Sequence, residues 1–160
     1  MKQFRTAPMD KLTLALTIIF GAICAGVFVA AVISVISGEL FMIFPGVVVL
    51  VVFVSSYLMI PSISVDREEI RVKNYFVNFP IKISEIAELK EVGRLQWVIR
   101  SFGVGGLFGN FGYFNGNDVW YVTNLRKKVQ ITMSSGKIYM LSPEAPEEFI
   151  NTVKNKKDSP

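Results

Sequence analysis

Two long uncharged apolar runs constrain this chain more than any other feature of its sequence. Residues 12–37 and 40–60 carry no charged side chain, and Glu39 is the one charge between them. As helices, these runs would extend roughly 39 Å and 31 Å at about 1.5 Å per residue. The hydrocarbon core of a bilayer is about 30 Å thick, so each run is long enough to cross it. The sequence therefore predicts a transmembrane hairpin over residues 12–60.

The flanks of the hairpin predict its orientation. Ser37-Gly38-Glu39 is a turn-forming cluster with one acid and no cation, whereas residues 1–11 form a basic arm and further cations follow residue 60. The positive-inside bias then places both termini in the cytoplasm. A cleaved signal peptide is disfavoured, because the first run is about twice as long as the apolar region such a peptide needs.

Small residues recur four apart in the first run, as in Gly21 with Ala25 and Ala22 with Gly26. Such a stripe allows close helix approach. It favours packing of the second helix over contact between copies of the chain.

The composition removes much of the usual catalytic chemistry. The chain has no histidine, and its single cysteine lies in the first apolar run, so imidazole bases, histidine metal sites and internal disulfides are excluded. The net charge of +4 is too mild for a nucleic-acid-binding surface. The spacing of Glu85, Glu88 and Glu91 is typical of the solvent-exposed side of a helical or irregular stretch, rather than of a catalytic pair of carboxylates. We expect no enzymatic activity, no cofactor and no metal site.

Residues 61–155 are predicted to form a small β-barrel of about six or seven antiparallel strands, capped by a C-terminal helix, with 156–160 as a tail. Alternation of apolar and polar residues predicts a strand pair around the turn at 66–69, and three later runs are expected to form a meander. The last segment has helix-start residues, early acids, late lysines and an apolar stripe at helical spacing.

The stretch RSFGVGGLFGNFGYF, residues 100–114, holds five glycines and four phenylalanines. It fails the dinucleotide pattern, because Phe108 stands where a glycine is needed, and no Gly-Lys-Ser/Thr sequence follows it. A phosphate-binding loop is therefore disfavoured. The glycines permit close backbone approach or positive φ, and the phenylalanines bury large apolar area. Packing in the barrel is favoured, with contact to a partner subunit or to the membrane surface as alternatives.

These residues resemble the bacterial pleckstrin-homology domain family of membrane proteins. The resemblance covers about residues 62–153, in three blocks. The first block comprises Arg100, Phe102, Gly103, Gly106, Phe108, Gly109, Gly112 and Phe114; the second Tyr121 and Thr123; the third Ser142, Pro143, Pro146 and Phe149. The resemblance implies a PH-like barrel with a C-terminal helix, often preceded by two transmembrane segments, and no enzymatic activity. It also implies a bacterial cytoplasmic membrane location.

Two functions remain as alternatives. The first is a membrane-anchored binding or scaffold module that assembles with itself or with another membrane protein, motivated by the missing catalytic residues and the aromatic block. The second is sensing of anionic lipid by the basic turn Arg126, Lys127 and Lys128, since juxtamembrane cations contribute about 1 kcal/mol each near anionic lipid. Eukaryotic PH domains bind phosphoinositides through a basic loop between their first two strands. The equivalent turn here, residues 66–69, has three acids and one base, which disfavours headgroup binding there.

Overall fold

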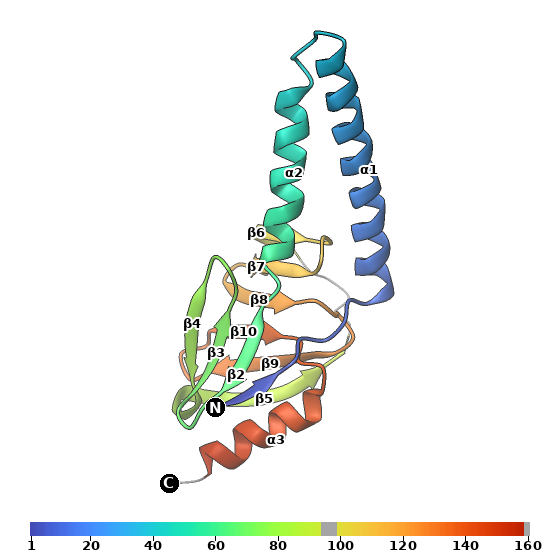
Figure 1. The fold of residues 1–160 in the computed structure, drawn as a ribbon. Helices are drawn as coiled ribbons and strands as arrows, with labels where there is room; N and C mark the ends of the chain where they lie inside the picture. Colours follow the sequence, from blue (N-terminus) through green and yellow to red (C-terminus); the bar gives the residue numbers. More distant parts are fainter. Residues whose placement is uncertain (94–98, 159–160) are drawn as a thin grey trace.

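A helical hairpin stands at one end of a two-sheet β domain (Figure 1). The computed structural model describes residues 1–93 and 99–158. The helices are α1 (Lys11–Ile36), α2 (Ile43–Leu58) and α3 (Pro146–Lys157), with a short 3-10 turn at Ile83–Glu85. The strands are β1 (Lys2–Phe4), β2 (Ser62–Val65), β3 (Glu69–Lys73), β4 (Asn78–Lys82), β5 (Ile86–Val92), β6 (Arg100–Gly105), β7 (Asn110–Phe114), β8 (Asp118–Val122), β9 (Lys128–Met133) and β10 (Ile138–Leu141).

The two apolar runs do form helices, but of unequal length. Among the described residues, α1 is the one helix long and apolar enough to cross a membrane. Helix α2 has 16 residues and extends about 24 Å. The expectation of a helix over the whole of 40–60 was therefore too long at both ends.

The helices pack through only some of the small residues expected, together with Gly46 of α2 and Ala31 of α1. A Cβ added to Gly46 would lie 3.0 Å from the Cβ of Ala31, and one added to Gly21 would lie 3.4 Å from the ring of Phe53. Ala22 and Gly26, which belong to the predicted stripe, are exposed. Only part of that stripe therefore faces α2.

The first sheet is antiparallel and has the order β1-β2-β3-β4. Strands β2 and β3 form the hairpin that the alternation predicts, with Ile63, Val65, Ile70 and Val72 buried on one face. Strand β1 comes from the segment that the sequence analysis treats as a basic arm. Its Lys2 and Phe4 lie opposite Val65 and Ile63 of β2. Strand β1 precedes α1 and strand β2 follows α2. The chain therefore leaves the first sheet, forms the helical hairpin and returns to the same sheet.

The second sheet has the order β5-β9-β10-β8-β7-β6. The three late runs are strands, as predicted, but they do not form a meander, because β10 lies between β9 and β8 and runs parallel to β8. Residues 86–92 form β5 rather than a helical or irregular stretch. The sequence of residues 94–102, RLQWVIRSF, also predicts a strand; residues 94–98 of it lie outside the described residues, and β6 begins at Arg100.

The two sheets do not close into a barrel, contrary to the prediction. The 3-10 turn at 83–85 separates β4 from β5, and among the described residues the strands form two separate ladders. Helix α3 packs against β5, with Phe149 and Val153 buried in the core. Its early acids and late lysines stand where the sequence predicts them. The rings of Phe4 and Phe149 meet edge to face, 5.2 Å apart, so α3 also supports β1.

Candidate functional site

The glycine and aromatic stretch forms the hairpin β6–β7, and its glycines let the two strands come unusually close. Gly103 lies opposite Gly112, and both have positive φ, 122° and 124°. A Cβ at Gly103 would overlap the carbonyl oxygen of Phe111 and lie 2.9 Å from the Cα of Gly112. No other residue fits this backbone, because only glycine combines this φ with the missing Cβ.

The tip of this hairpin contacts both helices (Figure 1). The turn is closed by a hydrogen bond from the Gly106 N–H to the carbonyl of Gly109, 2.9 Å long. The ring of Phe108 lies 5.1 Å from that of Phe53 and 5.4 Å from that of Tyr57, both on α2. Its backbone N–H donates to the Thr17 hydroxyl on α1, at 2.9 Å. Phe108 therefore joins the domain to α1 and α2 at once.

A second set of contacts holds the segment that leads into α1. Thr123 and Ser142, which belong to two separate blocks of the family pattern, lie 3.0 Å apart through their hydroxyl oxygens, and both are buried. Thr123 donates from its hydroxyl to the carbonyl of Ala7, and Asn124 donates from its amide to the carbonyl of Pro8. The pattern residues thus meet in space to fix the start of the helical hairpin.

Asp10 completes this attachment, because it caps α1 and binds the sheet domain. One carboxylate oxygen accepts from the backbone N–H groups of Leu12 and Thr13, at 3.1 and 3.0 Å. The other accepts from the N–H of Leu125, at 2.9 Å. Burial acts to raise the pKa of Asp10, but the N–H donors of Thr13, Leu125 and Leu12 stabilise the carboxylate, so the net pKa is lowered. We call the contacts of Phe108, Thr123, Ser142 and Asp10 with the helices and their lead segment the joint.

The structure contradicts the predicted lipid contact of Lys128. Its side chain is fully buried, and its amine donates to the backbone carbonyls of Gly93 and Leu125, at 2.6 and 2.8 Å. Burial lowers its pKa to about 8, although the carboxylate of Asp10 acts in the opposite direction. Arg126 and Lys127 are exposed. The predicted basic cluster therefore presents two cations rather than three, which is a weak basis for lipid sensing.

The remaining pattern residues divide between core and surface. Phe114 is buried against Trp120, with ring centroids 5.0 Å apart, and Tyr121 lies in the main core. Arg100 is exposed and extends along the glycine backbone at Gly105. Phe102 is 74% exposed. Packing thus accounts for most of the aromatic block, but not for Phe102.

The outer face of the first sheet is hollowed beneath the end of α2. This outer trough encloses about 1000 Å³. Tyr57 of α2 and Tyr75 of the β3–β4 turn stand at its helix end. The polar residues that line it include Gln3, Ser64, Glu69, Arg71, Lys73 and Asn78. Arg71 donates from Nε to the carboxylate of Glu69 at 2.9 Å, so the floor carries charges of both signs. No local sequence pattern predicts this trough, because Gln3 and Phe4 of strand β1 form part of its lining.

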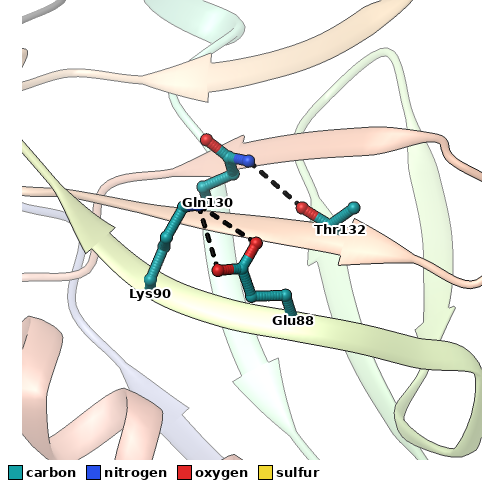
Figure 2. Close-up of polar contacts among 4 residues, drawn as sticks. All are labelled: Glu88, Lys90, Gln130 and Thr132. Carbon is teal, nitrogen blue, oxygen red and sulfur yellow. Dashed lines mark hydrogen bonds and ion pairs between the residues drawn. The ribbon is translucent and has the colours of Figure 1, made fainter.

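The candidate carboxylates lie elsewhere: Glu85 in the 3-10 turn before β5, and Glu88 and Glu91 in β5 itself. Lys90 donates to both carboxylate oxygens of Glu88, each at 3.0 Å, and their cross-strand neighbours on β9 are Gln130 and Thr132 (Figure 2). Glu85 pairs with Lys82 at 3.0 Å. Among the described residues, no cluster of three or more His, Cys, Asp or Glu could hold a metal ion.

Two sheets packed against a terminal helix, with an apolar hairpin inserted after the first strand, define a PH-like domain with a helical extension. Comparison with protein families agrees: the family described as Bacterial PH domain matches residues 61–157. The chain belongs to this family. No curated protein and no solved structure matches the chain.

The close approach of β6 and β7 predicts a large effect at Gly103 and a small one at Gly116. Gly103→Ala places a methyl group against the backbone of β7, which we expect to cost several kcal/mol in the free energy of unfolding. Gly116 also has positive φ, 93°, but a Cβ there meets no atom within 4 Å. Gly116→Ala should therefore cost about 1 kcal/mol. Chemical denaturation in mild detergent measures both, and equal losses would contradict the close approach.

The buried amine of Lys128 predicts a rise in stability with pH. Its folded pKa of about 8 lies below the ordinary value of 10.5, so the unfolded chain binds more protons between these values. The free energy of unfolding should then rise as the pH increases from 8 towards 10. Thermal unfolding in mild detergent across this range measures it. Lys128→Met should remove the rise, whereas Lys127→Met, which changes an exposed amine, should retain it. Equal slopes in the two variants would contradict the prediction.

Proposed function

We propose that this protein is a non-catalytic binding module, anchored in the bacterial cytoplasmic membrane by α1 and α2, with its PH domain on the cytoplasmic face. The pairing of β1 with β2 carries the proposal. Because one strand precedes the hairpin and the other follows it, both ends of the hairpin lie on the side where the domain lies. A chain that crosses a membrane through α1 must then cross back through α2.

The surfaces of the helices support this anchor. Large apolar side chains are exposed along both helices, among them Ile19, Ile33, Phe44 and Val51. Such a surface is stable in lipid and costly in water. The apolar residues 40–42, outside the helix, extend the apolar length of the second segment beyond the 16 residues of α2. The predicted cytoplasmic orientation follows from the positive-inside bias.

The joint argues against removal of α1 as a signal sequence. Cleavage after α1 would take away β1, the Asp10 cap and the contact of Thr17 with Phe108. It would leave Thr123 without the carbonyl of Ala7 that accepts from its hydroxyl. The folded domain therefore uses residues on both sides of α1.

The outer trough is the surface that we assign to a protein partner. It is open, and its floor carries Glu69 beside Arg71 and Lys73. Charges of both signs on an open face suit a polypeptide segment with complementary charges better than an anionic headgroup. Tyr57 and Leu58 at the end of α2 line the trough, so the partner is expected to be another membrane protein or a second copy of the chain.

Membrane extraction and labelling test the anchor. We expect the protein to stay in membranes at alkaline carbonate. In a Cys24→Ala background, Glu39→Cys should react with an impermeant maleimide from outside intact spheroplasts, and Asn151→Cys only after lysis. Residue 39 lies in the loop between the helices, and Asn151 is exposed on α3. Release by carbonate, or labelling of Asn151→Cys from outside, would contradict the proposal.

Photocrosslinking tests the trough. A photoreactive amino acid at Ser64, on the trough floor, should give a discrete crosslinked band in native membranes, which mass spectrometry would identify. The same amino acid at Asn151 is the matched control and should give none. The charge reversal Arg71→Glu should abolish the band without loss of the protein from membranes. A protein that stays monomeric and uncrosslinked at Ser64 would contradict a protein-binding role.

A further inference from the structure

The exposed apolar side chains of the sheet domain gather near the helical hairpin. In the described part of the domain, apart from Met1, the large ones are Tyr75, Phe76, Ile99, Phe102 and Tyr113. They belong to the β3–β4 turn and to the β6–β7 hairpin with the residue before it. Tyr75 is 78% exposed and Phe102 is 74% exposed. Both segments also contact the helical hairpin: the β3–β4 turn through hydrogen bonds to the end of α2, and the β6–β7 hairpin through Phe108.

The β3–β4 turn is fixed at the level where α2 ends. The backbone N–H of Tyr75 donates to the carbonyl of Leu58, the last residue of α2, at 3.3 Å. Asn74 donates from its side-chain amide to the carbonyl of Met59 at 2.9 Å. The Asn74 side-chain oxygen in turn accepts from the N–H groups of Phe76 and Val77, each at 2.8 Å. The turn therefore holds its two aromatic rings in place beside the end of the apolar helix.

Phe102 is held at a similar level by the other segment. Strand β6 is the edge strand of the second sheet, and it lies nearest to α2 in Figure 1. The tip of its hairpin is anchored through Phe108 to Phe53 and Tyr57, near the end of α2. The cations Lys73 and Arg100 are close neighbours of these rings in sequence and are exposed.

We propose that Tyr75, Phe76 and Phe102 form an aromatic rim that contacts the headgroup region of the bilayer that α1 and α2 cross. This inference rests on the proposed membrane anchor. Aromatic side chains concentrate at membrane–water interfaces, where the ring is partly buried and polar groups stay wet. Lys73 lies on the trough floor, so Arg100 is the exposed cation that we assign to lipid phosphates beside the rim. Contact on both sides of α2 fixes the tilt of the domain, so that the outer trough faces along the membrane surface.

Depth-dependent fluorescence quenching tests the rim. The full chain in the Cys24→Ala background, with an environment-sensitive dye at Phe76→Cys or Phe102→Cys, is reconstituted into vesicles of phosphatidylglycerol and phosphatidylethanolamine. The matched control carries the dye at Asn151→Cys, on α3 at the far end of the domain (Figure 1). We expect headgroup spin-labelled lipid to remove about half of the emission at 76 and 102, because interfacial rings lie at headgroup depth. It should leave position 151 nearly unchanged, and aqueous iodide should quench only 151.

The outcomes separate the rim from the anchor. If the labelled protein fails to float with the vesicles, the anchor itself is wrong and the rim falls with it. If the protein floats but 76 and 102 respond to lipid and iodide as 151 does, the anchor stands and the rim is overturned. Protection of 76 and 102 from iodide without quenching by lipid would show that protein covers them, which also overturns the rim. Quenching at only one of the two positions would contradict a single contact plane.

Discussion

The pairing of β1 with β2 is the constraint on which the rest of the structure depends. Two strands that are neighbours in the sheet are separated in sequence by the whole helical hairpin. Lys2 lies opposite Val65, and Phe4 opposite Ile63. The antiparallel ladder brings both ends of the hairpin to one sheet, and Phe149 of α3 closes over Phe4. The helices are thus an insertion within a sheet rather than a tail attached to a finished domain.

The glycine and aromatic block gains its role from this arrangement. Its glycines bring β6 and β7 together, and the tip of this hairpin lies at the base of the helices. There Phe108 packs on Phe53 and Tyr57 while its N–H binds Thr17. Together with Asp10 and Thr123, this contact joins the domain to the hairpin at several points. The block therefore has a structural role, and Phe102 is the member whose side chain is exposed for contact with another molecule.

Sequence patterns predicted the elements with local signals and missed those that depend on distant partners. The strands predicted from the alternation around Ile63 and Ile70 and the helix at 146–157 were correct, because each pattern lies within one element. The edge strand β1 has three residues, too few for a period, and its partner lies about sixty residues away. The insertion of β10 between β8 and β9 also leaves no local signal.

The candidate site shows the same division. The block pattern identified Thr123 and Ser142 as residues that matter, but only the fold shows that their hydroxyls meet and hold Ala7. The count of cations predicted three exposed charges in the turn at 126–128. Lys128 instead turns inward, because it lies on β9 where its amine reaches two backbone carbonyls. The direction in which a side chain points at the end of a strand depends on the neighbouring strands. The sequence alone does not show which strands those are.

The most direct test of the account is a disulfide between β1 and β2 in native membranes. Gln3 and Ser64 lie directly opposite each other in the ladder, and cross-strand neighbours of this kind have Cα atoms about 4.5 to 5.5 Å apart, within disulfide reach. In the Cys24→Ala background, Gln3→Cys with Ser64→Cys should oxidise rapidly within one chain and change its mobility in a non-reducing gel. Gln3→Cys with Asn151→Cys should not. A folded, membrane-bound protein that forms no such bond would show that the hairpin does not return to the strand from which it left.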